Sequence, residues 1–173
     1  MSASPSTPTI RRRLAAMLYE SMLLFGVLAV AGAVFAVALE QRHALYLREQ
    51  LQYALFIVLA LYFVWFWTHG GQTLAMKTWR IRLVTSSGAA VGYPRALLRY
   101  LLAWVWLLPG LVVAAAVDAH GPALLLIPAA NLLLWALTPF LDAERQFLHD
   151  RLAGTRLVQH APSAPASGKP ARI

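Results

Sequence analysis

The chain has 173 residues, of which 60% are apolar and only 13% are charged, about half the charged fraction of about 25% in a typical soluble domain. Fifteen Lys and Arg against seven Asp and Glu give a net charge of +8, and there is no cysteine. This composition excludes an ordinary soluble globule, a disulfide scaffold and any site that needs a thiolate. The length allows one domain.

Four long stretches with few charged residues follow one another along the chain. They are residues 14–39, 51–67, 98–117 and 123–141, and each approaches the ~20 residues that cross the hydrocarbon core of a bilayer. Because they are apolar all round, they differ from the helices of a soluble bundle, which show a polar face every 3.6 residues. The sequence therefore predicts an all-α fold, a polytopic membrane protein with four transmembrane helices.

Ionisable and helix-interrupting residues are few within these spans. The first span contains Glu20 as its single ionisable side chain, the third contains Pro109 and Gly110, and the fourth contains Pro128 and Asn131. A cleaved signal peptide is a weaker interpretation of the first span, because signal sequences carry only about 7 to 15 apolar residues. We therefore expect a retained helix.

Basic residues are concentrated in alternate segments of the chain. Thirteen of the fifteen Lys and Arg residues lie in the N-terminal tail, in the second connection with its edges, and in the C-terminal tail. Only Arg42 and Arg48 lie in the first connection, and the third has none. By the positive-inside rule, both termini are expected to be cytoplasmic. The expected partner is the lipid bilayer, through anionic lipids at its cytoplasmic face, and not nucleic acid.

The segments outside the spans are short. Residues 1–9 and 159–173 are rich in Ser, Pro and Ala, and we expect disordered tails on either side of a membrane domain at residues 10–158. After the fourth span, residues 142–155 mix charged and apolar side chains in a pattern that favours an amphipathic helix ending near Gly154.

The basic loop between the second and third spans contains an alternating pattern. From Trp79 to Leu83, large apolar residues alternate with arginines. This alternation predicts either a short strand or an interfacial segment with its apolar side in the membrane. Residues 89–93 are expected to return as a second strand if a β-hairpin forms.

Glu20 is the most informative ionisable residue, because a carboxylate within a span is costly and usually faces a bundle interior, a partner charge or water. It lies six residues after Leu14, about 9 Å into the span at 1.5 Å per residue. Arg13 precedes it by seven residues, nearly two helical turns, and so shares its face. Two interpretations stay open: a proton or cation site tuned by Arg13, or a hydrogen-bonded anchor between helices.

The other candidates carry weaker signals. Asn131 favours a hydrogen bond between helices over a ligand contact, and the neighbouring His149 and Asp150 form a pair that is common on ordinary surfaces. The chain contains no zinc-protease, nucleophile-elbow or phosphate-loop motif. We therefore expect no enzyme, no catalytic residue, no metal ligand and no cofactor.

Three segments together resemble the RDD family of bacterial membrane proteins: Arg-Arg-Leu at 12–14 leading to an acid in the first span, Gly-Gln-Thr-Leu at 71–74, and Leu-His-Asp-Arg-Leu-Ala-Gly-Thr at 148–155. The family is named for an arginine at the start of its first helix, an aspartate inside that helix, and an aspartate after its last membrane segment. The resemblance places the arginine at Arg13 or Arg12, the first acid at Glu20 in place of the usual aspartate, and the second at Asp150.

The resemblance implies a multi-pass protein of the bacterial plasma (inner) membrane. For the family, transport has been suggested, with cation/proton antiport for some members. One hypothesis is therefore a small transporter or antiporter that uses Glu20 to bind a proton or monovalent cation, as a homo-oligomer because four helices are few for a pathway. The alternative is a non-transporting scaffold or accessory subunit in which Arg13, Glu20 and Asp150 form a structural polar network.

Overall fold

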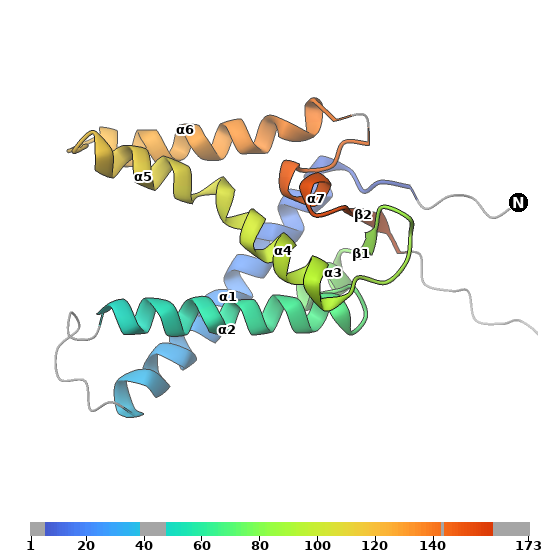
Figure 1. The fold of residues 1–173 in the computed structure, drawn as a ribbon, viewed down its shortest axis with the longest axis horizontal. Helices are drawn as coiled ribbons and strands as arrows, with labels where there is room; N and C mark the ends of the chain where they lie inside the picture. Colours follow the sequence, from blue (N-terminus) through green and yellow to red (C-terminus); the bar gives the residue numbers. More distant parts are fainter. Residues whose placement is uncertain (1–5, 39–47, 143, 161–173) are drawn as a thin grey trace, which may run out of the picture.

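The computed structural model describes residues 6–38, 48–142 and 144–160, and it is mostly helical (Figure 1). The first half of the chain forms α1 (Ile10–Ala38), α2 (Arg48–Thr68), α3 (Leu74–Thr78) and β1 (Ile81–Thr85). The second half forms α4 (Tyr93–Ala103), a 3-10 turn at Trp104–Trp106, α5 (Leu108–Ala116), α6 (Ala123–Leu137), a 3-10 turn at Thr138–Phe140, α7 (Leu148–Leu152) and β2 (Thr155–Gln159).

Three helices are long and apolar enough to cross a membrane: α1, α2, and α6 with its 3-10 extension to Phe140. The segment from α4 to α5 also meets the criterion, but it is bent by 43°, so the count is three spans, or four if the bent pair is one span. Pro109 explains the bend, because it has no amide hydrogen for the carbonyl four residues earlier and its ring clashes with that carbonyl.

The helices form two pairs that extend from a common base (Figure 1). In one pair α1 packs against α2, and in the other α5 packs against α6, while α4 lies against α2 and α7. Gly110 allows the close contact of α5 with α6, since a Cβ atom there would lie 2.8 Å from the Cβ of Asn131 and from the Cα of Pro128. The base is a small cap made of α3, β1, α7 and β2.

The strand alternative for the basic loop is correct, but its predicted partner is wrong. β1 pairs antiparallel with β2, from Ile81 opposite Gln159 to Thr85 opposite Thr155. Residues 89–93 do not return as a strand, because the chain closes a tight turn in which the Thr85 amide donates to the Ala89 carbonyl at 2.9 Å. The hairpin is therefore replaced by a pairing between distant parts of the chain.

The predicted amphipathic helix at 142–155 is correct only for Leu148–Leu152. Arg145 has a left-handed backbone conformation, with φ of 54°, which interrupts a right-handed helix. The Gln146 side chain is also committed elsewhere, because its Oε1 accepts from the Leu157 amide at 3.1 Å. After α7 the chain turns at Gly154 (φ 63°) and enters β2.

Residues 6–9 and 159–160 belong to the predicted tails and have contacts with the rest of the protein. The Gln159 amide donates to the Ser6 carbonyl at 2.8 Å, and the His160 amide donates to the Arg80 carbonyl at 2.8 Å. Pro8 is fully buried. Residues 6–9 and 159–160 therefore pack onto the cap, while the remainder of both predicted tails lies outside the described residues.

Candidate functional site

Glu20 lies where α1 meets α2 and the cap, and its side chain is 8% exposed. The Tyr62 hydroxyl of α2 donates to Glu20 Oε1 at 2.6 Å, and the Thr73 hydroxyl donates to Glu20 Oε2. No Lys, Arg or His nitrogen of the described residues lies within 4.0 Å of this carboxylate. Its partners are thus neutral hydroxyls.

Thr73 is held in place by the turn before α3. It is the N-cap of α3, and its Oγ1 accepts from the Met76 amide at 3.3 Å. Because the hydroxyl oxygen accepts from Met76, its single proton is free to be donated to Glu20. Gly71 has φ of 74° and its carbonyl accepts from the Leu83 amide at 2.7 Å, so the 71–74 motif connects Glu20 to the cap.

Asp150 forms a second buried centre, and its side chain is fully buried. Arg99 of α4 donates from Nε to Asp150 Oδ1 at 2.7 Å, and its guanidinium lies 4.1 Å from the centre of the Trp67 ring. Burial raises the pKa of Asp150, but the charges of Arg99 and His149 outweigh it, so the net shift is downward. This ion pair joins α4 to α7.

His149 completes this centre within a stack of aromatic rings. Its ring is nearly parallel to Trp135 (centres 5.5 Å apart) and Phe147 (5.9 Å apart). Burial lowers the pKa of His149 to about 4, Asp150 opposes the shift, and Arg99 adds to it. His149 is therefore neutral at physiological pH.

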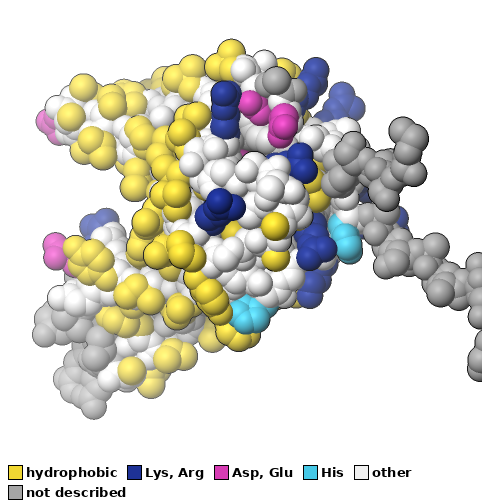
Figure 2. Space-filling view, turned by 45° about the vertical axis from the view of Figure 1, so that its right-hand side comes forward, with side chains coloured by type: hydrophobic (Ala, Val, Ile, Leu, Met, Phe, Trp, Pro, Cys, Tyr) yellow, Lys and Arg dark blue, Asp and Glu magenta, His cyan; other side chains and the backbone are white. Residues whose placement is uncertain are grey.

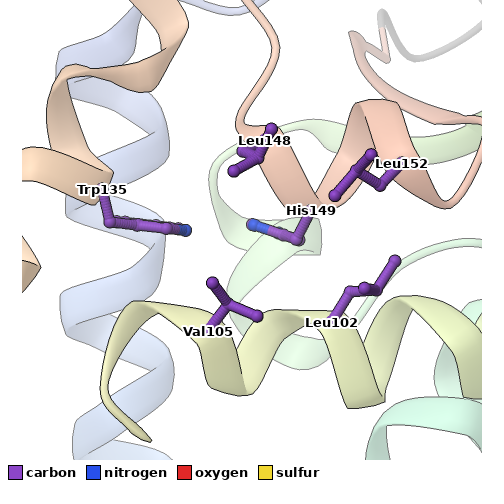
Figure 3. A pocket seen from close by; sticks show the side chains of 6 residues that line it. All are labelled: Leu102, Val105, Trp135, Leu148, His149 and Leu152. Carbon is purple, nitrogen blue, oxygen red and sulfur yellow. The ribbon is translucent and has the colours of Figure 1, made fainter. Parts of the chain in front are cut away.

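A cavity of about 10 Å³ separates His149 from Trp135, room for about one water molecule. Figure 3 shows the two side chains pointing toward each other, with Leu102 and Val105 on one side and Leu148 on the other. The space is too small to admit a substrate.

Arg13 joins neither acid directly. It is 2% exposed, its Nε donates to the Pro8 carbonyl at 3.0 Å, and its guanidinium lies 5.4 Å from the centre of the Phe147 ring. Within the described ranges no ion pair connects it to Glu20 or Asp150. No hydrogen bond or ion pair among the described residues therefore joins the three proposed network residues, although Arg13 lies near enough to Asp150 for their charges to interact.

The secondary candidates have structural surroundings. Arg12 is only half-buried, and its amide donates to Thr9 Oγ1 at 3.4 Å. Asn131 donates from Nδ2 to the Trp106 carbonyl at 2.6 Å, so it bridges α6 to the break before α5. This is the interhelical hydrogen bond expected for Asn131.

Sequence reasoning missed Tyr62, Thr73 and Arg99. Arg99 offered a usable signal, because a buried acid needs a base and Arg99 is one of the two arginines of α4. Thr73 lies in the Gly-Gln-Thr-Leu motif at 71–74, which marked it as a family position but not as a partner of Glu20. Tyr62 offered no signal, since tyrosines are common near membrane surfaces. In the part of the chain that the structure describes, no three His, Cys, Asp or Glu side chains cluster as metal ligands would.

The surface separates into two regions. Figure 2 shows hydrophobic side chains over the helix pairs, and Lys and Arg side chains mostly around the cap. Large apolar residues such as Phe25, Leu61 and Leu125 are exposed on α1, α2 and α6, as lipid-facing residues are. Together with three or four helices long enough to span, this defines a multi-pass membrane protein.

The chain belongs to the RDD family, whose family model matches residues 7–154. No curated protein and no solved structure matches the chain. The family match covers α1 to α7 and ends just before β2.

Proposed function

We propose that this protein is a four-span carrier of protons or monovalent cations in the bacterial plasma membrane, with Glu20 as the residue that binds them. The observation that supports this most is the set of partners around Glu20: two hydroxyls and, among the described residues, no positive charge. Cation/proton antiport is the form that the family resemblance favours.

The physical argument rests on the cost of a buried charge. An ionised carboxylate removed from water is expensive unless a positive charge compensates it. A bound proton or a monovalent cation supplies that compensation for Glu20, and the oxygens of Tyr62 and Thr73 are hard ligands of the kind that small cations take. Proton and cation therefore compete for one carboxylate, which is the exchange step of an antiporter.

The proposed topology places the cap and both termini in the cytoplasm. The basic residues of the cap satisfy the positive-inside rule in that orientation, and the bent segment from α4 to α5 is the third of the four spans. Interrupted spans leave backbone groups that can line an ion path. Glu20, which contacts Thr73 of the cap, then lies near the cytoplasmic end of the path.

The proposal includes a homo-oligomer and no enzymatic activity. No residue of the most apolar 18-residue window of α1 is buried, so a single chain leaves most of this helix for lipid or another copy. A path across the bilayer needs more walls than two diverging helix pairs supply. Lipid is the other proposed partner, and nucleic acid is not one.

A second candidate is a non-transporting scaffold. The ion pair of Arg99 with Asp150 favours it, because this pair is almost entirely buried and joins α4 to α7. On this hypothesis Glu20 is also a structural anchor, holding α1 to α2 and α3 through its two hydrogen bonds. The two candidates differ in whether the charge of Glu20 is needed once the protein is folded.

Ion flux in proteoliposomes tests the proposal. The purified protein is reconstituted with a pH gradient, and proton release is recorded on addition of Na⁺ or K⁺. We expect Glu20→Gln to abolish exchange, because Gln keeps the hydrogen-bond acceptor and cannot bind a proton or balance a cation. Glu49→Gln is the matched control, since Glu49 is exposed at the opposite end of α2, and its flux should equal that of the unmodified protein.

The melting temperature of each variant in detergent completes the test. Lost flux in Glu20→Gln with an unchanged melting temperature supports the carrier. Undiminished flux in Glu20→Gln, or no flux in the unmodified protein at any cation tested, contradicts it. A lower melting temperature for Glu20→Gln in a protein without flux supports the scaffold.

A further inference from the structure

A groove of about 610 Å³ lies beside the first turn of α1. It is lined by residues 7–11, by Arg13 and by Glu144 and Arg145 of the loop before α7. The groove is separate from Glu20 and from the ion pair of Asp150, neither of which lines it. Its lining brings together two segments that are far apart in the sequence.

Arg13 brings a buried positive charge to this groove. Only 2% of its surface is exposed, and one guanidinium nitrogen, Nη1, is buried without a hydrogen-bond partner among the described residues. Asp150 and Asp142 are the acids whose charges act on Arg13. Both already have another partner, because Asp150 pairs with Arg99 at 2.7 Å and Asp142 pairs with Arg151 at 3.2 Å. A buried guanidinium with a free donor favours an added anion.

The rest of the lining strengthens the positive potential. Arg11 and Arg145 are exposed at the rim, and Glu144 is the one acid in the lining, so the side chains carry an excess of two positive charges. The first turn of α1 contains no acidic residue. Its amides and helix dipole add a partial positive charge at the same point.

The position of the groove indicates the source of the anion. Leu14, Met17 and Leu18 follow Arg13 on α1 and are exposed, which places them in the hydrocarbon of a bilayer. The groove lies beside the turn of α1 that precedes these residues, and it is therefore level with the lipid headgroups. We propose that it binds the phosphate of an anionic phospholipid, with Arg13 as the buried contact and Arg11 and Arg145 at the rim.

Lipid binding to the purified full-length chain in a neutral detergent tests this proposal. The protein is stripped of lipid and titrated with phosphatidylglycerol or phosphatidylcholine, and bound lipid is measured by native mass spectrometry. We expect phosphatidylglycerol to bind at least tenfold more tightly than phosphatidylcholine. The variant Arg11→Gln/Arg145→Gln should lose most of that preference, because both side chains are exposed and their loss leaves the fold intact.

Arg95→Gln is the matched control, since Arg95 is an exposed arginine at the start of α4, and its preference should stay within twofold of the unmodified protein. Equal losses in the control and the double variant would show diffuse attraction and contradict a built site. A preference that survives in the double variant would also contradict it. Inorganic phosphate and glycerol phosphate form a separate arm: displacement of lipid by either at equal concentration would overturn the assignment to a lipid headgroup.

Discussion

Glu20 and Asp150 are both buried carboxylates near the cap, and their partners differ. Asp150 accepts from the Arg99 guanidinium at 2.7 Å, with His149 beside it. Among the described residues, Glu20 accepts from the hydroxyls of Tyr62 and Thr73 alone. One acid is compensated by a fixed positive charge of the protein, and the other is solvated by neutral dipoles.

On the proposed function, this difference separates a structural acid from an exchangeable one. A carboxylate paired with a buried arginine is held ionised, and losing either partner leaves the other charge exposed to a low dielectric. A carboxylate among hydroxyls keeps its hydrogen bonds whether it carries a charge, a proton or a cation. Variants that remove one group from each centre test whether the two acids differ in this way.

Asp150→Asn is expected to have the largest effect. It leaves the buried Arg99 without its counter-charge, a loss of about 3 to 5 kcal/mol in the free energy of unfolding. For a chain of this length that corresponds to a fall of roughly 6 to 20 °C in melting temperature, measured in detergent by intrinsic fluorescence. Asp118→Asn is the control, because Asp118 is exposed. Its melting temperature should equal that of the unmodified protein.

A paired replacement sharpens this prediction. Arg99→Met/Asp150→Leu removes both charges and should recover at least half of the loss, since neither charge is then left alone. A double variant as unstable as Asp150→Asn would show that the pair is not the source of the effect.

The pH dependence of stability should be the next largest effect. His149 has a pKa of about 4 in the folded protein against an ordinary 6.5, so between these values the unfolded chain takes up a proton that the folded chain does not. Stability is therefore complete above about pH 6.5 and falls as the pH falls toward 4, by about 3 kcal/mol at 1.36 kcal/mol per pKa unit. Below that range, protonation of Asp150, whose pKa is lowered, removes more.

Melting temperatures from pH 7.5 to pH 4.5 measure this fall. The variant His149→Gln should show a flatter profile over the same range, because it has no imidazole to protonate. A profile as steep as that of the unmodified protein would place the titrating group elsewhere.

Tyr62→Phe should have the smallest effect on stability. It removes one of two hydroxyl donors to Glu20, a loss of about 1 kcal/mol, read as a shift of roughly 2 to 4 °C in melting temperature. The carboxylate and Thr73 remain. A fall as large as that of Asp150→Asn would mean that Glu20 is as tightly integrated as Asp150, and the comparison would fail.

The helices were predictable because hydropathy is a local property of the chain. The apolar stretches containing Glu20 and Asn131 correspond to α1 and α6. The bend at Pro109 was signalled by its residue type alone. β2 was not predictable, because its paired residues lie 70 to 78 positions earlier in the chain. A basic-apolar stretch such as Arg156–Val158 gives no sign of which strand it will join.

The sequence identified the individual residues of the candidate site, but it did not predict which of them contact one another. Burial of Glu20 follows from its position within an apolar stretch, whereas burial of Arg13 does not follow from sequence, since its neighbour Arg11 is exposed. The separation of Glu20 from Arg13 does not follow either, because it depends on where α3 and α7 place Thr73 and Phe147. The family motifs indicated Arg13, Glu20 and Asp150 as candidates, and the structure gives each of them different hydrogen-bond partners.

The pairing of Arg99 with Asp150 also imposes an order on biosynthesis. The two residues are 51 positions apart in the chain, and ribosomes add about 5 to 20 residues per second. For roughly 3 to 10 s after Arg99 is added to the chain, its counter-charge does not yet exist. α4 therefore cannot pack against α7 until the chain is almost complete, so Arg99 lacks its buried counter-charge while α5 and α6 are being made.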